Sequence, residues 1–437
     1  MKGKTSLKHP SSRQQNSIFK KISGFCLKYK KQIIFVLLIA THVFLRFYLL
    51  LERASLGWDQ VDSAWAAKKI IADHEFLLSG PVVKGNSGIY MGPLYFYLVS
   101  IFYFFTNLDP VASPIFQAVL SVVNLLILFY VTKKLFGVKA AFWAMAINTF
   151  SLTVLNSDRV QSAYYLIVPV SYLIFYTLYN VICGHEKYIL PLAVFLGFSS
   201  HVDFTSILYP ILVLFTLPFF PKTKKTLKYV LFSLPVFFIF LLPSILTVLQ
   251  KTSSSSNSFL YLFNTFYHGI HLRRILQLSF DAFISIEQIL QFRFLRSFVF
   301  FVLPIFMVIY RASNRNKKSF LLFYLISLWF LIPWLVMSTY SGELTDYYFS
   351  LPRDIVIAIC AYLTVFMLRQ KRIIFKIAPL FFWIIYALLS LQTFFNGWGG
   401  NLTANKEYVK QVISEGKTIP FNDHGLNSYL YYIYTRK

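Results

Sequence analysis

The sequence predicts an all-α membrane protein that crosses the bilayer many times. Of the 437 residues, 57% are hydrophobic and 14% are charged, whereas soluble domains are about 25% charged. Apolar stretches of about 20 residues, the length that spans a bilayer, recur along the chain. The 42 Lys and Arg residues outnumber the 17 Asp and Glu residues, and they gather in short clusters between the apolar stretches. This placement indicates membrane topology and argues against a nucleic-acid partner.

The basic clusters orient the chain. Residues 1–31 contain nine Lys or Arg and no acid, which predicts a cytoplasmic tail followed by an uncleaved anchor helix in the plasma membrane. Clusters at 133–134, 222–228, 311–318 and 369–376 are expected on the same side. About eleven transmembrane helices satisfy these constraints, at 32–51, 114–131, 138–155, 160–182, 188–200, 203–220, 227–249, 297–311, 319–339, 353–368 and 373–395.

Functional residues are expected on the extracytoplasmic side, because the cytoplasmic loops are short. The first outer loop, 52–112, lies within a transmembrane domain 32–395. In that loop the apolar run 93–105 is too short to cross and is expected to lie in the interface. A small outer tail, 396–437, follows the last crossing. Its sequence predicts a helix over 408–413 and an aromatic strand over 428–434.

The first outer loop contains two acids. Asp59 and Asp62 are three residues apart and therefore share a face if this segment is helical. Such a pair can supply a general base, although Asp59 can equally cap a helix that starts near Gln60. A loop rich in Gly and Pro follows, over 79–93, and carries Lys84. This loop either surrounds a ligand, with Lys84 on a phosphate, or is a plain connector.

Two further outer turns carry ionisable residues. Asp158 and Arg159 either pair with each other or solvent, or Arg159 binds a phosphate. His201 and Asp203 interrupt a long apolar stretch, which favours a functional site, although the top of a helical hairpin can also be wet. No third ligand at diagnostic spacing accompanies them. The cysteines indicate neither a disulfide framework nor a thiolate metal site; they are Cys26, Cys183 and Cys360.

The last outer loop before the final two crossings combines aromatic and basic residues. Tyr347 and Tyr348 lie close to Arg353 in the sequence. Paired tyrosines at this depth are typical of an interfacial aromatic belt, and they can also line a site for a sugar or a lipid phosphate.

Six short elements follow one another along the chain: Gly57-Trp58-Asp59-Gln60, Gly80-Pro81, Gly92-Pro93-Leu94-Tyr95-Phe96-Tyr97, Lys133-Lys134-Leu135-Phe136-Gly137, Ser157 to Arg159, and Tyr347-Tyr348-Phe349-Ser350-Leu351-Pro352. Taken in order, they resemble the bacterial branch of glycosyltransferase family 39, the protein-mannosyltransferase and aminoarabinose-transferase-like enzymes of the GT-C superfamily. One departure is that many members place a second carboxylate a few residues after the Ser-Arg turn, where this chain has Gln161 and Ser162, so a divalent metal stays an open question.

The resemblance implies a GT-C-like membrane enzyme that moves a hexosyl or pentosyl group from a polyprenyl-phosphate donor to an acceptor hydroxyl. The acceptor would be a glycan, lipid or protein on the outer face, and the anomeric carbon would be inverted. A single displacement needs a carboxylate base, for which Asp59 is the first choice and Asp62 and Asp158 are the others. The implied donor-phosphate ligands are Lys84, Arg159 and Arg353. The implied substrate pocket contains Trp58, Gln60, Tyr95, His201, Asp203, Tyr347 and Tyr348.

Two other functions remain as alternatives. Polysaccharide polymerases and ligases are also polytopic with a large outer loop, but they usually keep their functional loop late in the chain, whereas Asp59 lies early. A transporter or flippase should show inverted repeats and paired broken helices at mid-membrane, and the sequence shows neither.

Overall fold

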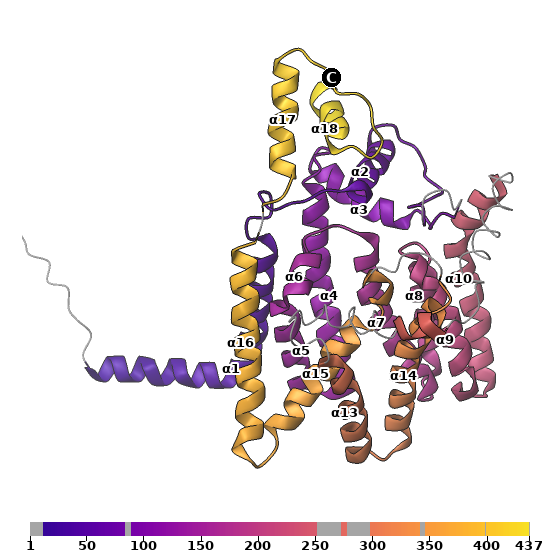
Figure 1. Cartoon of the computed structure of the whole chain (residues 1–437). Helices are drawn as coiled ribbons and strands as arrows, with labels where there is room; N and C mark the ends of the chain where they lie inside the picture. Colours follow the sequence, from indigo (N-terminus) through magenta and orange to yellow (C-terminus); the bar gives the residue numbers. More distant parts are fainter. Residues whose placement is uncertain are drawn as a thin grey trace, which may run out of the picture.

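The computed structural model describes residues 12–83, 89–250, 272–277, 298–340, 346–397 and 399–436. Helices dominate this part of the chain, and its one isolated β-bridge joins Val82 to Tyr90. Most helices run alongside one another in a bundle, from which the first part of α1 projects sideways (Figure 1). The bundle helices are α1 (Ser12–Phe47), α4 (Ala112–Phe136), α5 (Val138–Phe150), α6 (Leu152–Ser157), α7 (Ala163–Ile182), α8 (Ile189–Ser199), α9 (Leu208–Thr216), α10 (Lys224–Gln250), α13 (Phe298–Ser313), α14 (Lys317–Met337), α15 (Arg353–Leu368) and α16 (Ile373–Phe395).

Five described helices, α4, α7, α10, α14 and α16, are long and apolar enough to cross a membrane. The chain is therefore a multi-pass membrane protein. The other predicted crossings coincide with described helices as well, but several of these are short or, like α1, strongly basic. The number of eleven crossings therefore stays a prediction.

The predicted crossing 138–155 is divided into α5 and α6. Ser151 separates them with an extended backbone (φ −69°, ψ 121°), and it precedes α6 at the N-cap position, where serine is favoured. After this break, α6 leads the chain into the turn that holds Asp158 and Arg159.

Polar tips of large aromatic side chains are paired inside the bundle. The indole Nε1 of Trp329 donates to Ser171 Oγ at 2.9 Å, and Trp383 Nε1 donates to Thr364 Oγ1 at 2.8 Å. Since an unpaired polar group in hydrocarbon costs several kcal/mol, these contacts let big rings fill the core without that cost. They also specify which helices face one another.

The first outer loop forms two helices at one end of the bundle, α2 (Trp58–Ile71) and α3 (Leu94–Phe105) (Figure 1). They pack against each other. The 12 residues of α3 extend about 18 Å and cannot cross a 30 Å hydrocarbon layer. The expected short helix in this loop is thus confirmed. The α13–α14 and α15–α16 connections, which carry basic clusters, lie at the opposite end of the bundle.

The outer tail forms two helices, α17 (Leu402–Ser414) and α18 (Leu426–Thr435). Helix α18 packs on α2, and α17 packs on α18 (Figure 1). The predicted helix over 408–413 is confirmed, whereas the strand predicted over 428–434 is wrong. The strand was inferred from aromatic and β-branched content. The buried residues Leu426, Tyr429 and Leu430 instead recur at helical spacing, and Tyr429 packs edge-on against Trp65 of α2. Tertiary packing therefore outweighs β-propensity here.

Candidate functional site

The first turn of α2 leaves the side chain of Asp59 free of any capping role. The helix begins at Trp58, and Gly57 is the N-cap residue. The Gly57 backbone N–H donates to Gln60 Oε1 at 2.7 Å, so Gln60 closes the helix start. The alternative in which Asp59 caps a helix starting near Gln60 therefore does not apply.

The Asp59 carboxylate is exposed to solvent. No hydrogen bond or ion pair joins it to another residue in the part of the chain that the structure describes. Surrounding protein raises the pKa of Asp59 by desolvation, and the negative charge of Asp62 raises it further. An accessible carboxyl with a raised pKa and no partner is the arrangement that a general base needs.

A relay of amide side chains holds α2 in place. Gln60 Nε2 donates to the backbone carbonyl of Gln161, and Gln161 Nε2 donates to Tyr95 Oη at 2.8 Å. All three side chains are buried. The relay joins α2, the α6–α7 turn and α3 at Gln60, the residue that follows Asp59. Sequence analysis noted Gln161 only as a departure from the family pattern, because its partners are distant in the sequence.

Asp158 is part of a buried ion pair. Its Oδ2 accepts from Arg46 Nη2 at 2.8 Å, and the two side chains are 4% and 0% exposed. Arg46 also donates to the carbonyls of Asn148 and Thr149. This geometry ties α1 to α5 and favours a structural role for Asp158 over a catalytic one. The sequence signal for the pair was Arg46, the one charged residue in the first apolar run.

Arg159 binds the carboxyl end of α1. Its guanidinium donates to the Leu49 carbonyl at 3.0 Å and to the Leu45 carbonyl at 3.5 Å. The Phe394 ring lies 5.2 Å away and covers it. A cation at a helix C-terminus is stabilised by the helix dipole. The groups that would hold a phosphate are thus largely engaged by the protein itself.

Arg353, at the start of α15, keeps more of its binding capacity. It is buried, and its Nη1 donates weakly to Ser157 Oγ at 3.3 Å. Its Nε makes no hydrogen bond within the described residues. Because a buried guanidinium with an unmet donor seeks an acceptor, Arg353 stays a candidate ligand for an anion.

His201 and Asp203 make structural contacts within the protein, His201 with residues distant in sequence and Asp203 with a residue two positions away. His201 Nε2 contacts the Phe240 carbonyl at 2.7 Å, and Nδ1 accepts from the Leu94 N–H at 3.4 Å. A β-carbon on Gly92 would lie 1.9 Å from that ring, so only glycine fits there. Asp203 Oδ1 accepts from the Thr205 N–H at 2.9 Å and starts a short 3-10 helix. The histidine thereby fixes the loop that leads into α3.

The remaining predicted residues are less defined. Lys84 lies outside the described residues, and so does the side chain of Tyr347. Tyr348 is half-buried, with its ring centroid 5.6 Å from that of Tyr340. Within the described ranges, no three His, Cys, Asp or Glu residues are grouped so as to hold a metal ion.

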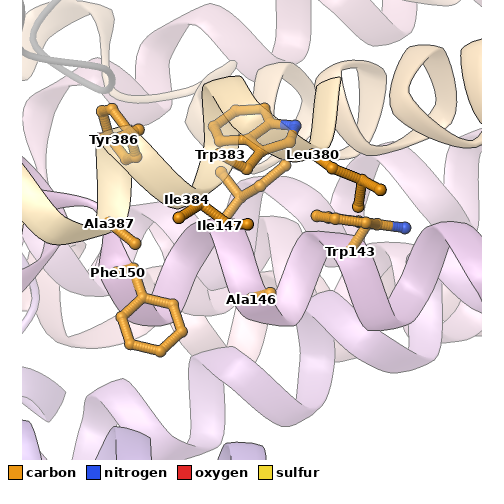
Figure 2. A pocket seen from close by; sticks show the side chains of 9 residues that line it. All are labelled: Trp143, Ala146, Ile147, Phe150, Leu380, Trp383, Ile384, Tyr386 and Ala387. Atoms are coloured by element: carbon orange, nitrogen blue, oxygen red, sulfur yellow. The ribbon is translucent and has the colours of Figure 1, made fainter. Parts of the chain in front are cut away.

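An apolar groove of about 180 Å³ opens between α5 and α16 (Figure 2). Aromatic and aliphatic side chains of both helices line it, among them Trp143, Phe150, Trp383 and Tyr386. Phe394, at the last turn of α16, contacts Arg159. The groove thus lies along a helix that leads to the α6–α7 turn, and its chemistry suits a hydrocarbon chain.

No family model and no curated protein matches the sequence. Solved structures do match. ArnT from Cupriavidus metallidurans bound to undecaprenyl phosphate is similar at a TM-score of 0.57 and 11% identity, over 91% of this chain and 74% of that one. A second match is the oligosaccharyltransferase AglB from Archaeoglobus fulgidus, in complex with an inhibitory peptide and a dolichol-phosphate. It is similar at a TM-score of 0.55 and 12% identity, over 91% of this chain and 61% of that one.

These likenesses show the fold. Both solved proteins are GT-C glycosyltransferases, so this chain has the GT-C fold. The fold class predicted from the sequence, an all-α polytopic membrane protein of the GT-C type, is confirmed. The position of the first-loop helices in the membrane interface stays a prediction. The chain spans about three fifths of the archaeal protein.

Proposed function

We propose that this protein is an inverting membrane glycosyltransferase that moves a sugar from a polyprenyl-phosphate donor to an acceptor hydroxyl on the outer face. The single observation that carries the proposal is the free, exposed carboxylate of Asp59 at the start of α2, in a chain with the GT-C fold. The similar structures were obtained with undecaprenyl phosphate in one case and dolichol-phosphate in the other, which supports a lipid-linked donor.

The proposed reaction is a single displacement. Asp59 accepts the proton of the acceptor hydroxyl as the oxygen bonds to the anomeric carbon, and the bond from that carbon to the phosphate oxygen breaks with its electron pair. The lipid phosphate leaves as an anion. Asp62 lies beside the base and tunes its proton affinity. Trp58, which is 72% exposed, offers a ring surface to the substrates.

The departing phosphate needs a cation. We assign this role to Arg353, whose Nε is unpaired among the described residues, and we keep Lys84 as a second candidate from the sequence. Arg159 and Asp158 would support the site from behind, through α1. The isoprenoid tail would lie along the apolar groove between α5 and α16, with the headgroup directed toward the α6–α7 turn.

The test is release of polyprenyl phosphate. Purified protein is incubated with a panel of polyprenyl-phosphate sugars and with glycan, lipid and peptide acceptors. We expect at least one donor to be turned over. Asp59→Asn should lower kcat/KM by about 10²-fold to 10⁴-fold, the usual contribution of a general base.

Asp73→Asn is the matched control. Asp73 follows α2, and its carboxylate pairs with Lys68 at 2.6 Å. This variant should keep turnover close to that of the unmodified protein. Full turnover by Asp59→Asn with a confirmed donor would remove Asp59 as the base. Failure of every donor would remove the proposed function.

A further inference from the structure

The connection between α17 and α18 carries a histidine onto α2. His424 Nδ1 lies 2.6 Å from Asp62 Oδ1. The same imidazole stacks on the Trp58 indole, with centroids 5.2 Å apart and an angle of 21° between the rings. The His424 side chain therefore contacts Trp58 and Asp62, the two α2 residues that lie on either side of Asp59 in the sequence. The proposed function assigns no role to His424.

The outer tail is anchored to the segments that flank the first-loop helices. The Gly400 N–H donates to the Glu52 carbonyl at 2.8 Å, and Asn401 pairs with both the N–H and the carbonyl of Leu56 at 2.9 Å. Lys406 binds Asp109 at 2.7 Å. Because these bonds tie the tail to the segments before α2 and after α3, His424 is held by the fold itself.

The charges around this contact are mostly negative. Asp59 lies beside Asp62, and Asp423 acts on Asp62 from the tail. Tyr95 of α3 faces Asp59 as a neutral phenol. Lys68, further along α2, is engaged by Asp73. Among the described residues, only His424 forms an ion pair with either α2 carboxylate.

We infer that His424 is a positioning residue of the proposed reaction: it fixes Asp62 and Trp58 and offsets the negative charge beside Asp59. The inference rests on the proposed function, because it assumes that Asp59 is the base. Burial raises the pKa of Asp62, the hydrogen bond and charge of His424 oppose that rise, and Asp423 adds to it. Loss of the imidazole should therefore leave the negative charge of Asp62 without its positive partner. Because that negative charge acts on Asp59, the pKa of Asp59 should rise as well.

The kinetic test is the pH dependence of kcat/KM. A base must be deprotonated to act, so kcat/KM falls as pH drops through the pKa of the base. We call this falling part of the pH profile the acid limb, and it should move to higher pH in His424→Ala. At neutral pH we expect a loss of about threefold to fivefold, the size of a partly exposed ion pair. His424→Lys, which keeps the positive charge, should restore the limb, and His424→Gln should be intermediate.

Asp423→Asn is the matched variant with the opposite sign. It removes a negative charge that acts on Asp62, so its acid limb should move to lower pH. A residue that merely stabilises the tail would not shift the limb in opposite directions for these two changes. Unmoved limbs in an active protein would overturn the inference.

A second measurement needs no substrate. The imidazole of His424 stacks on the indole of Trp58, and an imidazole in this position quenches indole fluorescence. The emission of the protein should therefore rise in His424→Ala, and the same change should have no effect in a Trp58→Phe background. If His424→Ala leaves the emission unchanged, the contact is absent and the inference fails. If the contact is present but no donor is turned over, the proposed function fails, and the catalytic role of His424 fails with it.

Discussion

The acids at the start of α2 and the charges buried between α1, α6 and α15 differ in what they contact. Asp59 is open and has no partner among the described residues, whereas Asp158 is almost fully buried against Arg46. The sequence placed both acids among the catalytic candidates. The difference shows that an acid in an outer loop or turn can either hold helices together or stay free for other contacts, and that its partners decide which.

The cations follow the same division. Arg159 is engaged by two carbonyls at the end of α1 and by an aromatic ring. Arg353 makes one long hydrogen bond and keeps an unmet donor within the described part of the chain. A buried region can therefore combine structural cations with one that has capacity for a ligand.

The largest effect on stability is expected from breaking the Arg46–Asp158 pair. Arg46→Ala should leave the Asp158 carboxylate buried without its partner and lower the free energy of unfolding by about 3–5 kcal/mol. Thermal denaturation of the detergent-solubilised protein measures the change. Arg53→Ala is the matched control, because Arg53 also donates to backbone carbonyls, those of Phe394 and Phe395, but lies nearer the surface. Arg53→Ala should lower the free energy of unfolding much less than Arg46→Ala does.

A double variant separates stability from catalysis. Arg46→Met together with Asp158→Leu removes both charges, and apolar replacement of a buried pair is often neutral for stability. We expect this protein to fold and to keep turnover. If it folds but loses as much activity as Asp59→Asn, Asp158 is a catalytic residue after all.

Much of the fold was predictable, because apolar stretch length and basic clusters report directly on helices in a bilayer. The same signals located α3 as a short helix. The strand predicted over 428–434 failed because its aromatic residues pack on Trp65, a contact that no local pattern reveals.

The site was harder to predict for the same reason. Asp59 and Arg353 became candidates through residue type and order along the chain, and their roles stay predictions. The roles of Asp158, Arg159 and His201 depend on partners that are distant in sequence, such as Arg46, Leu49 and Phe240. His424 was missed entirely, since 362 positions separate it from Asp62.

An intermediate effect is expected from the relay that links the open and buried regions. Gln161→Leu removes the donor to Tyr95 Oη and should cost about 1–3 kcal/mol of stability, because a buried hydroxyl loses its partner. Activity should fall as well, since α2 rests on the same turn. Tyr95→Phe should have a similar cost. In a double-mutant cycle the two changes should not add, and additive losses would show that the relay does not act as a unit.

The smallest effect is expected from Asp62→Asn, and its sign tests which carboxylate is the base. The charge of Asp62 raises the pKa of Asp59, so removing it should lower that pKa and extend activity to lower pH. The asparagine can still bond to His424, but there is no longer a charge to offset. A further change of His424→Ala in this background should therefore leave the acid limb in place. If Asp62→Asn instead abolishes turnover at every pH, Asp62 is the base and Asp59 is the residue that tunes it.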